Sequence, residues 1–295
     1  MSSFVVNNQA VREDLLDVLT NLTPSENQLV SGLGTSTAKS TRHEWLTDTL
    51  GSVKTNAFLE GATATQHTLT NPSRLLNYTQ ISRQGFSVSD TERAVNTAAF
   101  SDRYTYEAEK AMKMLKNDME LALMSGSLLC GSGAVTGQMK GIKNWLSLAT
   151  NQSGVSLSEA IFNDYLQLVW DNGTEVNAAY VPMAIKRRIA GWVGNATAKN
   201  INVTDKRLVN SVSVYEADAA KMVKLFPHRY VNTGVASGHN DIVLINEDLF
   251  KIAYLRKPFN RELAKTGDST EGEIVTEYTL ECLHQHAGVV GQEHY

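Results

Sequence analysis

The chain has 295 residues, of which 42% are hydrophobic and 20% are charged, and its formal net charge is −4. This composition is too apolar for a disordered chain and predicts a sizeable core, more readily in two subdomains than in one. The mildly acidic balance argues against a protein that wraps nucleic acid directly, because such proteins are usually basic. Cys130 and Cys282 lack a CxxC partner, so we expect no disulfide framework and a reducing cytosol.

The first 40 residues are expected to form an arm. A tract rich in Gly, Ser and Thr over 31–41 predicts an extended connection, because such a composition cannot bury itself. We find no basic region followed by an apolar stretch and no run of about 18 apolar residues, so we expect neither a signal peptide nor a membrane span. Ahead of this tract, a short amphipathic helix is predicted over 10–22 from apolar residues on one face: Val11, Leu15, Leu16 and Leu19.

Residues 41–90 predict a long two-stranded excursion. The stretch Arg42–Asp48 alternates as a strand does, and alternation returns over 75–88 after a turn placed between Glu60 and Pro72. Neither side of this ribbon is apolar enough to enter a core, and isolated two-stranded ribbons are only marginally stable in water. We therefore expect the ribbon to lie on a surface outside its own domain.

The strongest helical signal covers Arg103–Ser125. Ser101 or Asp102 can cap the start of this helix, and Gly126 can end it. Glu120 is expected on the solvent-facing side, spaced to pair with a lysine four residues earlier. The opposite side carries an apolar stripe that consists of Tyr104, Ala108, Ala111, Met112, Leu115, Met119 and Ala122.

From about residue 151 the pattern changes to an α/β block that is predicted to extend to 255. Ser156 and Glu159 match a capping box that opens a helix to about Trp170, and Pro182 sits where a first-turn proline begins another helix. Short strands are predicted at 176–181, 212–215, 222–226, 241–245 and 249–255. After a turn-rich loop comes an unusually long strand, one face of which carries Ile274, Thr276, Tyr278, Leu280, Cys282 and His284.

Three glycines between the long helix and the α/β block loosely match a dinucleotide-binding fingerprint. They are Gly131, Gly133 and Gly137. The fingerprint follows a strand and opens a helix, with an acidic residue in a following strand. Here the glycines follow a helix, and no acidic residue is suitably spaced, so a hinge or turn explains them better than a nucleotide site does.

A zinc site is the other ligand site that the residue types allow. Cys282, His284 and His286 alternate on one strand face, and His294 follows near the end. Structural zinc sites usually pair ligands from two segments, whereas only one cluster is present, so ordinary strand residues are the preferred interpretation. No GxSxG or HExxH motif occurs, and we expect no catalytic activity, no metal and no cofactor.

The parts follow one another in a distinctive order, and six stretches carry a family resemblance: HEWLTDTL, NAFLEGATA, LKNDMELALMSG, GQMKGIKNWL, LRKPFNRELAKTGDST and EYTLECLHQHAGVV. In this order they resemble the major capsid proteins of tailed double-stranded DNA bacteriophages, which share the Hong Kong 97-type capsid fold. The resemblance implies an α+β fold with an N-terminal arm at 1–40, an extended β-ribbon loop at 41–90, a periphery domain with a long spine helix at 91–150, an axial domain at 151–255, and a return to the periphery domain through a C-terminal strand at 256–295.

The resemblance also implies a function. The chain would self-assemble into pentamers and hexamers of an icosahedral phage head in the virion, built in the host bacterial cytoplasm, and would enclose double-stranded DNA without sequence-specific binding. A separate scaffolding protein and a portal would be partners, with decoration proteins left open. An encapsulin-like nanocompartment shell and, less favoured, a nucleotide-binding enzyme stay as alternatives. The candidate contacts with neighbouring subunits are Arg42, Glu44, Trp45, Phe58, Glu60 and Arg74.

Overall fold

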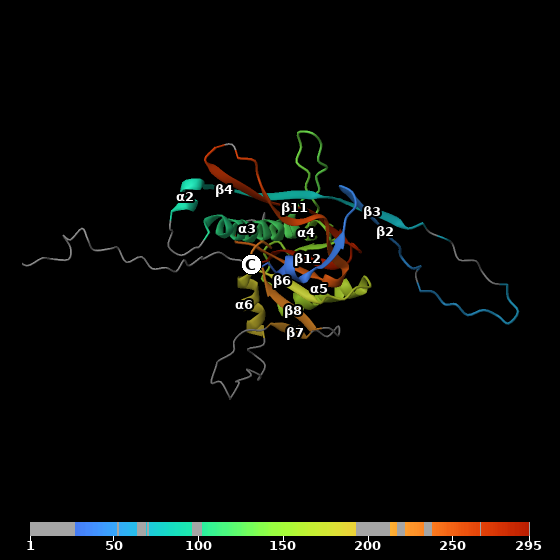
Figure 1. The fold of residues 1–295 in the computed structure, drawn as a ribbon. Helices are drawn as coiled ribbons and strands as arrows, with labels where there is room; N and C mark the ends of the chain where they lie inside the picture. The colour runs from blue at the N-terminus through green and yellow to red at the C-terminus, as the bar shows by residue number, and fades with distance from the viewer. Residues whose placement is uncertain are drawn as a thin grey trace, which may run out of the picture.

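The computed structural model describes residues 27–51, 53–63, 69, 71–95, 102–192, 213–216, 222–232, 238–265 and 267–294. The amphipathic helix expected over 10–22 lies outside the described residues. Within them, the chain forms two sheets, a separate two-stranded ribbon, and helices that pack on the sheets (Figure 1). The helices are α1 (Gln28–Gly32), α2 (Asp90–Ala94), α3 (Arg103–Ser125), α4 (Ile142–Trp145), α5 (Glu159–Asp171), α6 (Met183–Trp192) and the 3-10 helix η3 (Glu247–Leu249).

The two sheets mix strands from distant parts of the sequence. The four-stranded sheet has the order β1 (Gly34–Thr37), β10 (Phe250–Glu262), β11 (Ser269–Cys282) and β4 (Gln80–Ser89). The six-stranded sheet has the order β5 (Leu148–Asn151), β12 (Gly288–His294), β9 (Asn240–Ile245), β6 (Ala178–Val181), β8 (Met222–Pro227) and β7 (Val214–Glu216). The ribbon pairs β2 (Arg42–Thr47) with β3 (Ser73–Tyr78) in antiparallel fashion.

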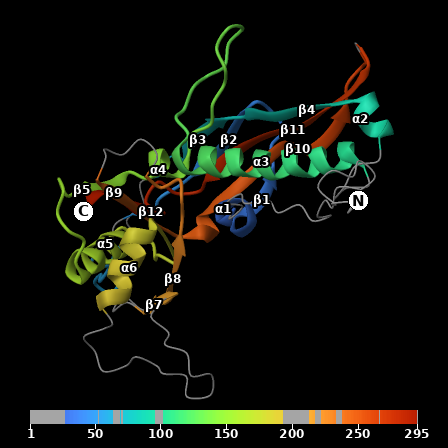
Figure 2. The same cartoon turned by 90° about the vertical axis from the view of Figure 1, so that its left-hand side faces the viewer.

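Helix α3 has the predicted bounds, because its signals are local. Asp102 is its N-cap, and the carboxylate accepts hydrogen bonds from the backbone N–H groups of Tyr104 at 3.1 Å and Thr105 at 3.4 Å. Gly126 is its C-cap. At 1.5 Å per residue the helix is about 35 Å long. It lies along the four-stranded sheet (Figure 2), where its buried stripe joins the larger hydrophobic core with Leu115, Met119, Leu123, Ile274 and Tyr278.

Glu120 corrects the expected solvent face of α3, because its side chain is fully buried. Its carboxylate accepts hydrogen bonds from the backbone N–H groups of Leu29 at 2.8 Å and Val30 at 3.0 Å, in the first turn of α1. His228 Nε2 lies 2.9 Å from the same carboxylate. The backbone N–H of Tyr230 donates to His228 Nδ1, so a neutral His228 ring carries its proton on Nε2 and donates it to Glu120. Glu120 therefore caps one helix from inside another.

The middle of the six-stranded sheet is buried on both faces, which explains why residues 242–245 of β9 and all four residues of β6 are apolar or aromatic. Along β9, Ile242 and Leu244 enter the core beneath α5 and α6, whereas Val243 and Ile245 enter the larger core that includes α3. β6 behaves in the same way, since all of its residues are buried. Successive strand residues point to opposite faces, so a strand between two helical layers has no polar side.

The strand partners differ from the expected segment boundaries. β4 pairs with β11, so residues 80–89 belong to the four-stranded sheet and not to the free ribbon expected over 41–90. β10 begins within the block expected over 151–255, yet it also lies in the four-stranded sheet. β12 lies in the six-stranded sheet, although 256–295 was expected to return to the other sheet. The alternation of polar and apolar residues predicts that a segment is a strand, but it does not predict which distant segment the strand pairs with.

Helix α5 begins with a different cap from the one that the capping-box pattern predicts. Ser158 is the N-cap, and its Oγ accepts a hydrogen bond from the backbone N–H of Ile161 at 3.3 Å. Ser156, the serine of the expected box, is exposed two residues before the cap. We expect Ser158→Ala to lower the free energy of unfolding by about 1 kcal/mol. Ser156→Ala is the matched control and should have no measurable effect in chemical denaturation. Equal losses in the two variants would contradict the assigned cap.

Candidate interaction surface

One side of the ribbon faces its own subunit, and Trp45 is the residue that fixes it there. The indole Nε1 of Trp45 donates to the carbonyl of Cys282 at 2.8 Å, and its ring centroid lies 5.5 Å from that of Trp145. His43, on the same side of β2, brings Nε2 within 3.8 Å of a Glu281 carboxylate oxygen. Trp45 is thus held on its own subunit, and its expected role in a contact with a neighbouring subunit stays a prediction. The receiving surface belongs to α4 and β11, which are too distant in sequence to be recognised from the ribbon.

Asn77 holds the returning strand of the ribbon in the same way, and sequence reasoning did not single it out. Its side chain is fully buried. The Nδ2 group donates to the carbonyls of Leu280 at 2.7 Å and Lys140 at 3.1 Å, while Oδ1 accepts from the backbone N–H of Lys140 at 2.8 Å. A lone asparagine in an alternating strand gives no sequence signal of such a role. The base of the ribbon is thus rigidly attached to its subunit.

The other side of the ribbon faces solvent and brings together three of the expected contact residues. Glu44 pairs with Arg42 at 2.5 Å and with Arg74 at 3.2 Å, and both arginine side chains remain more than half exposed. Exposed ion pairs of this kind contribute about 0–1 kcal/mol to stability. Leu46 on the same side is 65% exposed. Their role in contacts between subunits stays a prediction, and the structure leaves these groups accessible for it.

Beyond Thr47 the chain leaves the body of the subunit, and its described residues form no strand (Figure 1). A turn closes where the backbone N–H of Ala62 donates to the carbonyl of Leu59 at 3.1 Å, with Gly61 at φ +80°. Phe58 is 61% exposed, and Glu60 within the turn is also exposed. Further large apolar side chains of this segment stand in water: Leu50 at 101%, Val53 at 102%, Leu59 at 87% and Leu69 at 90% exposure.

These exposed side chains are an unused source of binding energy. Burying one leucine, valine or phenylalanine side chain contributes about 1.5–3 kcal/mol before the loss of chain entropy is subtracted. Single exposed apolar residues are common on monomeric proteins, but five in one projecting segment mark an interaction site. We call residues 48–72 the ribbon tip. The geometry of the tip suits a contact with another molecule.

The three glycines that loosely match a nucleotide fingerprint lie in a hairpin. Leu129 and Gln138 exchange both backbone hydrogen bonds, at 3.1 and 3.0 Å, and a tight turn follows between Ser132 and Val135. A dinucleotide-binding loop connects a strand to the N-terminus of a helix. In this described region the segment instead follows helix α3 and leads to the short helix α4. The interpretation as a turn is confirmed.

The cysteine and histidines considered for zinc serve other purposes. The Cys282 thiol donates to the carbonyl of His284 at 3.1 Å, and burial raises the pKa of this thiol to about 12. His294 is buried away from them, with Nε2 2.9 Å from the Tyr165 hydroxyl. Burial also lowers the pKa of His294 below its ordinary value. Across the part of the chain that the structure describes, no three His, Cys, Asp or Glu side chains are placed to hold a metal ion.

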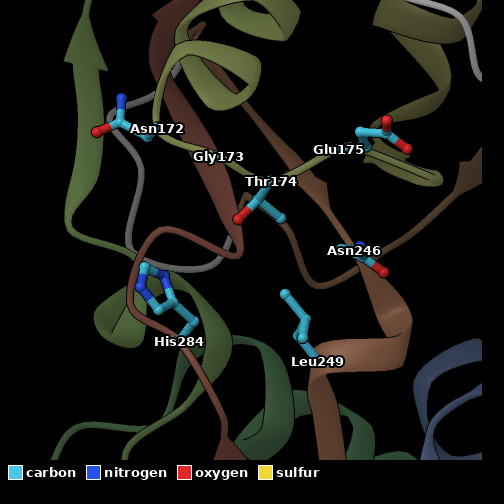
Figure 3. Close-up of a pocket in the computed structure, with 7 residues that line it drawn as sticks. All are labelled: Asn172, Gly173, Thr174, Glu175, Asn246, Leu249 and His284. Atoms are coloured by element: carbon cyan, nitrogen blue, oxygen red, sulfur yellow. The ribbon is translucent and has the colours of Figure 1, made fainter. Parts of the chain in front are cut away.

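A recess of about 460 Å³ lies where the end of α5 meets η3 and the turn between β11 and β12 (Figure 3). Its titratable side chains are Glu175 and His284, which lie on opposite sides of the recess and do not form an acid–base pair (Figure 3). Burial and the neighbouring His286 lower the pKa of His284.

Two further observations bear on the class of protein. Among the described residues, no helix is both long and apolar enough to cross a bilayer. Residues 2–293 match the family described as the SU10 major capsid protein. The chain belongs to the SU10 major capsid protein family. The expected resemblance to phage major capsid proteins is thus confirmed at the level of the family.

Individual relatives of this SU10-type capsid protein agree. A major capsid protein of Escherichia phage Phieco32 is 34% identical over 106 residues, which cover 36% of this chain and only 30% of the relative. A structure from Gordonia phage Cozz aligns with a TM-score of 0.64 at 13% identity, over 97% of this chain and 92% of the other. The capsid of a native GTA particle aligns with a TM-score of 0.65 at 13% identity, over 100% and 99% of the two chains.

A third structure shows that this fold is not confined to phage heads. The holo-SrpI encapsulin complex from Synechococcus elongatus PCC 7942 aligns with a TM-score of 0.60 at 12% identity, over 99% of this chain and 95% of the other. At sequence identities this low, structural similarity supports a shared fold and does not support a shared function. The expected α+β capsid fold of Hong Kong 97 type is therefore confirmed, and the family match carries the assignment as a capsid protein.

Proposed function

We propose that copies of this chain form pentamers and hexamers of an icosahedral phage head that encloses double-stranded DNA. The ribbon tip is the observation that supports it most directly, because its large apolar side chains find no burial among the described residues of their own subunit. A contact of obligate size buries upwards of about 2,000 Å². At about 25 cal/mol per Å² this gives a gross gain of about 50 kcal/mol, from which association and ordering entropy are subtracted.

The fold suggests a division of labour among the segments. The four-stranded sheet with α3 would be the periphery domain, and the six-stranded sheet with α5 and α6 would be the axial domain near the capsomer centre. The ribbon, whose base is held on the body through Trp45 and Asn77, would carry the contact that fits both pentamers and hexamers. A net charge of −4 would let packed DNA slide past the shell without adhering.

The proposed setting is a virion assembled in the bacterial cytoplasm. A separate scaffolding protein and a portal would act with the shell, and decoration proteins could be added to its outside. These partners are suggested by the family resemblance, and the role proposed for the chain is structural. An experiment has to test whether the shell consists of pentamers and hexamers and whether it encloses DNA.

The alternative is an encapsulin-like compartment, and the similarity to the SrpI encapsulin complex favours keeping it. The two functions differ in what the shell contains. Particles isolated from the natural source should contain nuclease-protected double-stranded DNA. Particles that hold one stoichiometric enzyme in place of DNA would favour the compartment.

Electron microscopy of the purified chain tests the shell itself. We expect closed particles with five-fold and six-fold capsomers after expression in a bacterium, alone or with a scaffolding protein from the same genome. Expressed alone, the chain should sediment as capsomers or shells at micromolar concentration. A chain that stays monomeric under both conditions would contradict the proposed function.

A further inference from the structure

The end of β12 turns a histidine side chain into the interior. The pairing of β12 with β9 shifts between Gly291, which faces Ile242, and His294, which faces Asn240, so three steps along β12 correspond to two along β9. Within this bulge Glu293 lies at φ +57°, a left-handed conformation that is uncommon for residues other than glycine. The side chain of His294 is fully buried.

The ring of His294 joins β12 to two other segments. Its Nε2 atom lies 2.9 Å from the Tyr165 hydroxyl of α5, and its Nδ1 atom lies 3.2 Å from the carbonyl of Val155 in the turn after β5. Because a carbonyl only accepts, a neutral ring carries its proton on Nδ1 and accepts from the Tyr165 hydroxyl at Nε2. We define residues 152–155 and 291–294 as the β12 corner, which lies at the end of the molecule that carries β5 and α5 (Figure 2).

The charged groups around this ring come from several elements. Asp241 of β9 and Arg188 of α6 act on it with opposite charges. The Asp241 carboxylate is already engaged, since it accepts from Lys143 Nζ of α4 at 2.5 Å and from the backbone N–H of Glu293 at 3.1 Å. Tyr165 keeps its proton, because burial raises the pKa of its hydroxyl. Among the described residues, the anion nearest to the ring is thus shared with a lysine.

A proton on His294 is therefore unfavourable while the β12 corner is closed. Burial lowers the pKa of His294 below its ordinary value of 6.5, and the Val155 carbonyl and Asp241 offset this only in part. In an open corner the ring is in water and binds a proton more readily than in the closed corner. The closed corner is thus fully stable above about pH 6.5 and loses stability as the pH falls below that value.

The β12 corner can open without disturbing the middle of the sheet. β5 is an edge strand, and in the described sheet it pairs with β12 alone. Beyond β5, the backbone N–H groups of Gln152 and Gly154 donate to the carbonyls of Gln292 at 3.1 Å and Glu293 at 2.8 Å. Val155 is 48% exposed, so this turn lies at the surface and water can enter when it moves. The left-handed Glu293 adds local strain that only the surrounding contacts hold in place.

We propose that His294 is a proton-operated switch, whose protonation opens the β12 corner while the central strands of the six-stranded sheet stay paired. A buried neutral histidine that must take up a charge is the general basis of such switches. The switch acts within one subunit, so it goes beyond the proposed function and does not depend on the formation of shells. In a shell, a mildly acidic medium would loosen this edge of the six-stranded sheet in every copy.

Hydrogen exchange of the unaltered chain, below the concentration at which shells form, tests the switch. Exchange rates are divided by those of an unstructured chain at the same pH, which gives protection factors free of the intrinsic effect of pH. We expect the protection of the Gln152 and Gly154 amides to fall at least about threefold between pH 7.5 and pH 5.5, and that of residues 242–245 to stay within about twofold. No fall in the β12 corner would overturn the proposal. An equal fall in both places would overturn it too, because the whole sheet would then open.

A substitution identifies the group that takes up the proton. His294→Gln keeps a polar side chain that does not titrate, so its protection factors should agree within about twofold at the two pH values. His286→Gln is the matched control, because His286 lies in the turn before β12, outside the β12 corner, and this variant should keep the fall. A fall in His294→Gln as large as in the unaltered chain would overturn the proposal. If His294→Gln does not fold, NMR titration of the His294 ring in the unaltered chain decides: proton uptake should accompany the loss of protection, and uptake without that loss would overturn the proposal.

Discussion

Replacing the ribbon tip, residues 48–72, with an Asn-Gly turn should abolish closed shells and leave a folded subunit. Thr47 and Ser73 are the last directly opposed residues of β2 and β3, so a two-residue turn of type I′ can join them without changing the register. The segment removed carries the exposed Phe58 and its apolar neighbours. Without them, the neighbouring copy loses the surface that the proposed contact depends on.

The stability of the shortened subunit should not fall. The large apolar side chains removed are exposed, and shortening the loop to two residues lowers the closure entropy by about 2 kcal/mol. Negative-stain microscopy and sedimentation measure the shells, and thermal unfolding measures the subunit. Normal shells from the shortened chain would show that the ribbon tip does not interlock the copies.

A pair of point variants separates apolar contact from mere length. Phe58→Glu places a charge on an apolar side chain of the ribbon tip, whereas Asn56→Glu places the same charge on an exposed polar position two residues away. We expect the first to reduce the yield of shells at least tenfold and the second to keep it within twofold. Equal yields would mean that Phe58 is not buried on assembly.

Local signals explain how much of the fold the sequence predicts. Helix α3 matches its predicted bounds because helical periodicity, the Asp102 cap and Gly126 all act within a few residues of one another. Four of the five strands predicted for the α/β block begin and end within two residues of observed strands, but β10 continues to Glu262 through the segment that was expected to be a turn-rich loop. Which strands pair was not predictable. β4 and β11 are far apart in the sequence, and the alternation of residues within a strand does not identify the strand that it pairs with.

In the candidate interaction surface, too, features that depend on local sequence were predictable and features that depend on distant segments were not. The exposed ribbon tip was predictable, since a polar and Thr-rich ribbon cannot form a core of its own. The contact of Trp45 with its own subunit could not be predicted, because it is made to Trp145 and the Cys282 carbonyl, which come from other parts of the chain. The hairpin between α3 and α4 contains no charged residue, since none occurs between Glu120 and Lys140, but its glycines drew attention to a nucleotide motif instead.

Glu120 shows that local sequence patterns also fail to predict burial within a helix. It falls on the face of α3 that carries lysines, and helical spacing alone predicts that it is solvated. Near its C-terminal end, however, the helix is covered by α1 and by the residues after β8, so Glu120 is buried together with Met119 and Leu123. Tertiary contacts from distant segments override the pattern there.

Glu120→Ala should therefore lower the free energy of unfolding by about 3 kcal/mol or more, because hydrogen bonds to a charged acceptor contribute about 1.5–3 kcal/mol each. The variant leaves the N–H groups of Leu29 and Val30 and the ring of His228 without their acceptor in a dry environment. Glu120→Gln keeps the shape and one acceptor oxygen, so its loss should be smaller.

The measurement is urea unfolding followed by tryptophan fluorescence, at subunit concentrations below assembly. Lys116→Ala is the matched control, because Lys116 is exposed one turn earlier on α3 and should change stability by no more than about 0.5 kcal/mol. A loss of less than 1 kcal/mol for Glu120→Ala would mean that the carboxylate does not hold α1 in place. Since Glu120 joins α1, α3 and the segment after β8, the loss should appear in one cooperative transition: these parts of the two sheet layers share a single buried carboxylate and cannot separate without exposing it.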